Sequence, residues 1–161
     1  MPKVKRPNNI ARNDLRQDDV IDANGVASLA VSPNEQDLSS LQTLFDHANW
    51  TLHKARSYRE GMLEMSRGLV HVIICECQLP DGNWKDVLSK TAPMPERPRL
   101  VVISRDADEH LWSEVLALGG YDVLETPLKE LEVAYVVGSA WFDWEHEHGR
   151  AKRRVLTTVS G

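Results

Sequence analysis

The sequence predicts an α/β fold in which helices cover both faces of a doubly wound, five-stranded parallel sheet. Short apolar runs alternate with segments of helical periodicity through residues 26–144, and this alternation is typical of parallel sheets built from strand-helix-strand units. Two of the runs, residues 70–75 and 99–104, are almost continuously apolar. Strands that are buried on both faces have this composition.

The first half of the chain contains three expected strands and two expected helices. Residues 26–31 (VASLAV) form an apolar run, which Ser32-Pro33-Asn34 closes with a turn. Residues 50–55 predict a second strand, and Ser57 to Glu60 have the capping-box pattern of a helix start. Residues 70–75 form the third strand. The helix between the first two strands is indicated by apolar residues at helical spacing: Leu38, Leu41, Leu44, Phe45 and Ala48.

The second half of the chain repeats this pattern. A helix over residues 83–90 is expected to end at the proline-rich residues 91–98, and residues 99–104 form the fourth strand. The acidic residues 106–109 favour the start of the next helix through its dipole, and residues 121–125 form the fifth strand. The last helix is indicated by apolar residues on one side: Val133, Val136, Val137, Ala140, Trp141 and Trp144.

Composition limits the class of protein. The chain has 161 residues, enough for one domain with a full core. Its net charge of -5 argues against non-specific nucleic-acid binding by the body of the protein. Its two cysteines, Cys75 and Cys77, lie two residues apart on one expected strand and cannot join distant segments, which favours a reducing compartment.

The sequence also predicts where the domain begins and ends. Residues 1–24 are polar and locally basic, and we expect a flexible arm there, followed by one domain over residues 25–148 and a basic tail over residues 149–161. No apolar stretch is long enough for a membrane span, and the N-terminus lacks the apolar core of a secretion signal. A cytoplasmic location is therefore expected.

Three motifs carry a resemblance to a known family. LPDG follows the third strand (residues 79–82), SRDADEHLWSEVLALGGYDVL covers residues 104–124, and TPL follows the fifth strand. With the strand-helix alternation, this pattern resembles the CheY-like receiver domains of bacterial response regulators. The resemblance implies a flavodoxin-like sheet of order 2-1-3-4-5, with a site above strands 1 and 3 that binds magnesium and accepts a phosphoryl group on an aspartate.

The resemblance assigns a family position to particular residues of this chain. The phosphoacceptor aspartate corresponds to Glu76, three residues before the leucine of LPDG. The acidic pair that holds magnesium corresponds to Ser32 and Pro33, which supply no charge. The hydroxyl residue at the end of the fourth strand is present as Ser104.

Two further family positions are changed. Thr126 replaces the lysine that follows the fifth strand, and Val123 replaces the switch aromatic within it. Without a metal or a lysine, no cation offsets charge on a transferring phosphoryl group. The sequence therefore predicts a degenerate receiver that is not an enzyme, has no cofactor and works independently of phosphorylation.

The sequence allows two interpretations of Glu76. Its carboxylate carries the charge of an aspartate and reaches further, so it is a candidate mimic of the activated state. The mimic is incomplete, because a phosphoryl group brings more charge and three acceptor oxygens. The alternative interpretation is a solvated acid that remains at the strand end after the site has decayed.

The expected role is a stand-alone interaction module in bacterial two-component (phosphorelay) signalling. Receivers commonly use the surface of helix 4, strand 5 and helix 5, which here includes parts of residues 108–119 and 129–148. Because little chain follows His148, we expect the output to come from a partner, either a histidine kinase or an output protein, and a homodimer through this surface is a further possibility. We expect no membrane or nucleic-acid partner. Candidate contact residues are Trp84, Trp112, Tyr121 and Tyr135.

Two other functions stay open on the sequence. One is a working phosphoacceptor with an unorthodox site, at Glu76 or Asp81 together with Ser104. The other is a small-molecule binder that uses the crevice at the ends of strands 1 and 3, near Ser32.

Overall fold

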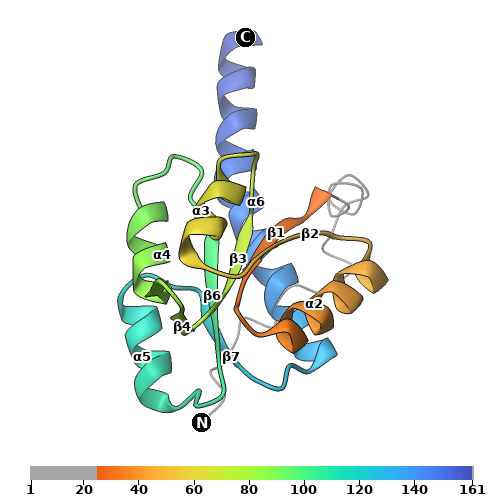
Figure 1. Ribbon diagram of the computed structural model, residues 1–161. Coiled ribbons are helices and arrows are strands. Elements are labelled where there is room, and N and C mark those ends of the chain that lie inside the picture. Colours follow the sequence, from red (N-terminus) through yellow and green to blue (C-terminus); the bar gives the residue numbers. More distant parts are fainter. Residues whose placement is uncertain (1–24, 161) are drawn as a thin grey trace.

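Five parallel strands form one twisted sheet in the order β2-β1-β3-β6-β7 (Figure 1). The computed structural model describes residues 25–160, with side chains described through His148. This order is the predicted 2-1-3-4-5 arrangement, so the predicted fold class is confirmed. The strands are β1 (Ala27–Val31), β2 (Thr51–Ala55), β3 (Val72–Glu76), β6 (Arg99–Ser104) and β7 (Asp122–Glu125).

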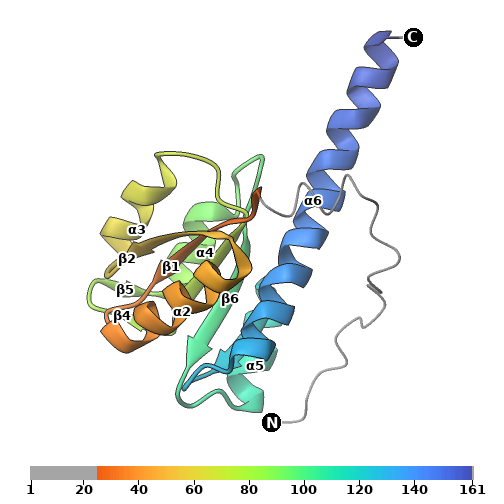
Figure 2. The same ribbon diagram turned by 90° about the vertical axis from the view of Figure 1, so that its right-hand side faces the viewer.

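Helices cover both faces of the sheet (Figure 2). Helices α2 (Glu35–Ala48) and α6 (Glu130–Ser160) pack on one face, and the other face carries three helices, α3 (Tyr58–Met65), α4 (Trp84–Thr91) and α5 (Glu109–Ala117).

The two faces of the sheet explain the continuous apolar runs. Val72 and Ile74 of β3 belong to the core under α2 and α6, whereas Ile73 and Cys75 belong to the core under α3, α4 and α5. Successive side chains of a strand point to opposite faces. Each residue of such a strand is therefore buried, and no alternation with polar residues is needed.

Polar side chains start the helices at the predicted positions. Asn34 accepts hydrogen bonds from the N–H groups of Gln36 and Asp37, and Ser57 accepts one from the Glu60 N–H. Asn83 forms a reciprocal capping box with Asp86 at the start of α4. These contacts satisfy N–H groups that have no partner inside the helix.

Two features were not predicted from the sequence. The LPDG turn joins a two-stranded antiparallel hairpin, β4 (Gln78–Leu79) and β5 (Gly82–Asn83), which leads directly into α4. The last helix continues past the predicted domain boundary at residue 148, and α6 ends at Ser160. The sequence there contains good helix formers, with no proline to stop the helix.

Two predictions concern the N-terminal arm and a membrane span. The predicted N-terminal arm, residues 1–24, lies outside the described residues. Within the described part of the chain, no helix is long and apolar enough to cross a membrane.

Candidate functional site

The carboxyl ends of neighbouring strands bring the predicted site residues to one edge of the sheet. Val31 of β1 pairs with Cys75 of β3, and Glu76 pairs with Ile103 of β6. Ser32, Glu76 and Ser104 therefore follow one another across adjacent strand ends. The Thr126 N–H donates to the Ser104 carbonyl at 3.0 Å, which places Thr126 at the same edge.

Asp37 also belongs to this site, although its role was not predicted. It lies in the first turn of α2 and is only 9% exposed. The Ser32 hydroxyl lies 3.4 Å from Asp37 Oδ2, as donor to it, and accepts a hydrogen bond from the Asn34 N–H at 3.0 Å. The turn after β1 therefore directs the Asp37 carboxyl toward the strand ends. In the sequence, an acid three residues after Asn34 is equally typical of an ordinary helix start.

The pKa values of both carboxyl groups are shifted by their surroundings. Burial and, to a smaller extent, the negative charge of Asp37 raise the pKa of Glu76 to about 7, against the opposing effect of the Arg105 guanidinium. Burial also raises the pKa of Asp37, against the effect of the Ser32 hydrogen bond and of Arg105. Near neutral pH, Glu76 is therefore about half protonated.

This donor set does not fit the magnesium ion that the family resemblance implies. Magnesium is held by carboxylates in near-octahedral oxygen geometry. Among residues 25–148, no three His, Cys, Asp or Glu side chains are grouped to hold a metal ion. The cation that acts on both carboxyl groups is Arg105, and a second cation beside it is electrostatically unfavourable.

Comparison with known proteins finds its matches among solved structures. No family model and no curated protein matches the sequence. A signal receiver domain of an HD domain-containing protein from Pseudomonas fluorescens superimposes with a TM-score of 0.71, at 22% identity, over 79% of this chain and 94% of that chain. The chain has the fold of a CheY-like receiver domain.

Two further receiver domains support this assignment of the fold. A CheY-like response regulator receiver domain from Methanospirillum hungatei has a TM-score of 0.68 at 15% identity, over 76% of this chain and 98% of that chain. The receiver domain of a signal transduction histidine kinase from Syntrophus aciditrophicus has a TM-score of 0.65 at 16% identity, over 74% of this chain and 92% of that chain.

The remaining positions of the receiver site have local structural roles. Ser104 is 8% exposed, and its hydroxyl accepts a hydrogen bond from the Asp106 N–H at 3.1 Å. Val123 is buried in the core of the α3, α4 and α5 face. Pro33 is exposed beside the site. This receiver fold therefore has no aromatic side chain at the Val123 position to respond to a change at Ser104.

Asp81 is engaged elsewhere. Its two carboxylate oxygens accept hydrogen bonds from the N–H groups of Tyr58 and Arg59, at 2.7 and 3.0 Å. These bonds lower the pKa of Asp81. Asp81 thus attaches the hairpin to the start of α3, and this role argues against its use as the alternative phosphoacceptor.

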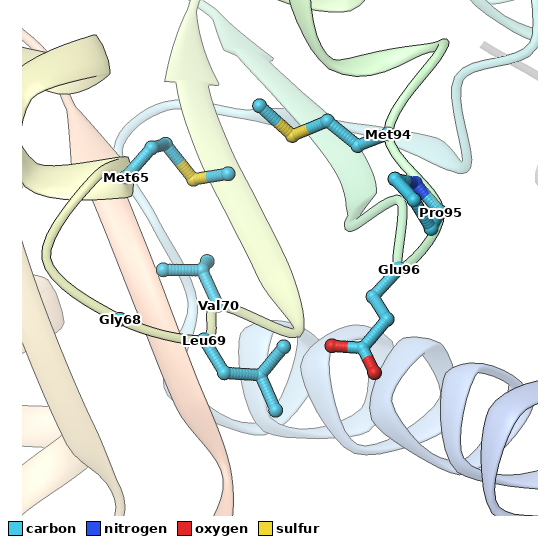
Figure 3. Close-up of a pocket in the computed structure, with 7 residues that line it drawn as sticks. All are labelled: Met65, Gly68, Leu69, Val70, Met94, Pro95 and Glu96. Carbon is cyan, nitrogen blue, oxygen red and sulfur yellow. The ribbon is translucent and has the colours of Figure 1, made fainter. Parts of the chain in front are cut away.

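Two hollows lie at opposite edges of the sheet. One, of about 290 Å³, is beside the receiver site and is lined by polar residues such as Asp37, Arg105 and Thr126, together with Pro127. The other, of about 440 Å³, lies where β3 and β6 begin and is mostly apolar, with Glu96 at its rim (Figure 3).

The candidate partner residues differ in exposure. Trp84 is 2% exposed and packs in the core with Val87 and Leu79, so the interpretation of Trp84 as a partner contact is wrong. The first turn of α4 directs its ring inward. Trp112 is partly buried against the same core.

The two tyrosines also differ. The hydroxyl of Tyr121 donates to Asp143 Oδ2 at 3.0 Å, and burial raises the pKa of Tyr121 above its ordinary value. The side chain of Tyr121 therefore ties β7 to α6. Tyr135 is 37% exposed on α6.

Proposed function

We propose that this chain is a receiver-fold domain of two-component signalling that binds a partner protein and does not accept a phosphoryl group. The observation that carries the proposal is the pairing of Glu76 with Asp37 beside Arg105, at the strand ends where the family resemblance implies phosphorylation. On this proposal the domain is not an enzyme.

The chemistry of phosphoryl transfer supports the first part of the proposal. The step depends on positioned cations that offset charge on the transferring group. The resemblance implies a lysine where this chain has Thr126, and Ser32 and Pro33 cannot hold a metal. Arg105 is already held in the field of two carboxyl groups.

The protonation of Glu76 supports it further. A carboxyl group with a pKa of about 7 is half protonated at neutral pH, and the protonated form is a weak nucleophile. The same protonation reduces the average charge of Glu76. Glu76 is therefore also a poor permanent mimic of a phosphoryl group, which carries about -1.5 to -2 charges at pH 7.

The surface of the domain supports the second part of the proposal. Three large apolar residues are exposed along α5 and α6, on either side of the edge strand β7: Leu118 (53%), Leu131 (86%) and Tyr135 (37%). Leu131 and Tyr135 lie four residues apart on α6 and so share one side of it. We propose that this surface, the α5-β7-α6 face, binds a signalling protein or a second copy of the chain.

The experiment that tests the absence of phosphorylation is a titration with magnesium and beryllofluoride, followed by amide NMR of the full chain. We expect no saturable shifts of the Glu76, Ser104 and Thr126 amides. The matched variant Glu76→Asp restores the family's acceptor and is expected to stay unresponsive, because Thr126 and Ser32 are unchanged. Saturable, magnesium-dependent shifts in the native chain would show a working receiver site and would overturn the proposal.

A second candidate function rests on the polar hollow of about 290 Å³ beside Asp37 and Arg105. A hollow at the ends of parallel strands that is lined by a carboxyl group and a guanidinium group is a typical place for a small polar ligand. A co-purifying small molecule detected by native mass spectrometry, and lost in Arg105→Gln, would favour this function over partner binding.

A further inference from the structure

Three stacked rings connect α6 to the amino-terminal edge of the sheet. The centroids of the His71 and Trp144 rings lie 4.5 Å apart, in an edge-to-face arrangement, and the centroids of the Trp144 and His148 rings also lie 4.5 Å apart. His71 directly precedes β3, whereas Trp144 and His148 lie one turn apart on α6. His71 and Trp144 are 7% and 3% exposed. The carboxyl-terminal part of α6 extends beyond the sheet (Figure 2).

We propose that His71, Trp144 and His148 form a proton-sensitive clasp, which holds α6 on the sheet while His71 is neutral and releases it when His71 is protonated. The inference does not rest on the proposed function, because the clasp lies at the opposite edge of the sheet from Glu76.

A backbone hydrogen bond makes the clasp sensitive to protonation. The Ala27 N–H donates to His71 Nδ1 at 3.0 Å. An accepting Nδ1 must carry a lone pair, so the proton of the neutral ring sits on Nε2. Protonation places a second N–H on Nδ1, facing the N–H of Ala27. The imidazolium therefore cannot keep both this hydrogen bond and its position in the stack.

The groups around His71 set the direction of its titration. Burial lowers the pKa of His71, and the positive charge of His148 lowers it further. The Ala27 backbone and the charge of Glu96 act in the opposite direction, and the net pKa stays lowered. Glu96 lies in the segment between α4 and β6, and its side chain extends toward α6 in Figure 3.

The other charged groups of the cluster lie on β6 and α6. Arg99 Nη1 is 3.3 Å from Glu147 Oε1, and Arg99 Nη2 donates to the Asp143 carbonyl at 3.4 Å. His148 Nε2 is 3.1 Å from the same Glu147 oxygen. These contacts join α6 to β6 and do not reach the His71 ring, so we assign the sensitivity of the clasp to His71.

The closed clasp depends on ring contacts more than on hydrogen bonds. Within the described part of the chain, the buried Nε1 of Trp144 has no hydrogen-bond partner. A buried donor without a partner disfavours the closed state, because water would satisfy it in an open one. This cost opposes the ring contacts, and the loss of the Ala27 bond on protonation adds to it.

The pH window follows from the lowered pKa of His71. The neutral ring stabilises the closed state fully above the ordinary histidine pKa of 6.5, and this stabilisation is lost as pH falls below that value. Because α6 continues to Ser160 as one helix, opening at Trp144 and His148 changes the direction of the whole segment beyond the sheet.

The first measurement is the protonation of His71 in the full chain, by NMR of the imidazole nitrogens between pH 8 and pH 5. We expect the Nε2–H tautomer at pH 8 and a midpoint below 6.5. A proton on Nδ1 at pH 8, or a midpoint above 6.5, would overturn the proposal. This measurement needs no variant.

The second measurement is hydrogen exchange of the α6 amides over residues 141–148, corrected for intrinsic exchange at each pH. We expect protection to fall by up to about tenfold for each pH unit between 6.5 and the His71 midpoint and to level off below it, with no such fall in α2. An unchanged protection of residues 141–148 between pH 7.5 and pH 5 would contradict the clasp.

Two variants separate His71 from other titrations. His71→Asn keeps an acceptor for the Ala27 N–H and cannot be protonated in this range, so its α6 protection is expected not to change with pH. His110→Asn, at an exposed position of α5, is the matched control and keeps the pH response. A normal pH response in His71→Asn would show that another group drives the opening.

Discussion

Glu76 and Asp37 show how burial and a neighbouring charge change the chemistry of a strand end. From the sequence, Glu76 is an acid at the position where the family resemblance implies a phosphoacceptor. In the structure it is close enough to Asp37 and sufficiently buried for its pKa to rise to about 7. The raised pKa means that the folded state favours the protonated carboxyl. The ionised carboxyl therefore reduces stability, in contrast to the usual surface acid.

The first prediction concerns the stability of Glu76→Gln. Because the pKa of Glu76 is raised from 4.5, the wild-type stabilisation is complete below pH 4.5 and is lost as pH rises through about 7. At pH 8 the variant is expected to be more stable than wild type by about 1–2 kcal/mol, after allowance for solvent screening. Urea unfolding at pH 5 and pH 8 measures this difference. Glu132→Gln, at a partly exposed position of α6, is the control, and an equal gain in both variants would contradict the assignment to the Glu76 site.

At the level of a single element, the start of α4 depends on the LPDG turn that precedes it. Asn83 and Asp86 cap the helix reciprocally, and Asn83 is also the last residue of the β4-β5 hairpin. A Cβ on Gly82 would lie 2.7 Å from Asp86 Oδ2, so a larger residue there would displace this capping carboxyl. The residues of the LPDG turn thus stabilise α3 through Asp81 and leave room for the cap of α4. The motif has a structural function in this chain.

The second prediction is the cost of removing that cap. Asn83→Ala is expected to lower the free energy of unfolding by about 1 kcal/mol, because two N–H groups of α4 lose their acceptor. Asn83→Asp keeps an acceptor and is expected to stay close to wild type. Chemical denaturation of the three proteins measures the difference. A loss of equal size in both variants would indicate that hairpin packing and not capping determines the effect.

On the scale of the whole molecule, the two faces and two edges of the sheet have separate roles. The receiver site lies at the carboxyl ends of the strands, and the clasp lies at their amino ends. The exposed apolar residues Leu131 and Tyr135 lie between these edges, on α6. Because α6 packs on the sheet and also forms part of the α5-β7-α6 face, a change in its packing changes that face.

The third prediction tests that surface. Leu131 is 86% exposed, so Leu131→Glu is expected to change the free energy of unfolding by no more than about 0.5 kcal/mol. If the α5-β7-α6 face joins two copies, sedimentation equilibrium of the native chain is expected to show association that Leu131→Glu removes. Leu63→Glu, at a 58% exposed position of α3 outside this surface, is the matched control. Equal weakening by both variants would argue against a specific interface.

The fold could be predicted from the sequence because it depends on local patterns that repeat along the chain. Apolar runs buried on both faces and capping residues at helix starts identify strands and helices one at a time, and their alternation leaves few possible arrangements. The residues at the strand ends, Ser32, Glu76, Ser104 and Thr126, could be placed together for the same reason.

Only the tertiary structure decided what those side chains contact. Asp37 lies in the site because the turn after β1 directs its side chain inward. Trp84 is buried and not exposed, because the first turn of α4 faces the core. The clasp joins His71 and Trp144, which lie far apart in the sequence. Such contacts depend on how helices are placed on the sheet, and periodicity shows which side of a helix is buried but not which distant residue it meets. The sequence by itself therefore determined the architecture and the changed receiver positions, whereas the protonation of Glu76 and of His71 depends on burial and neighbours that only the folded chain creates.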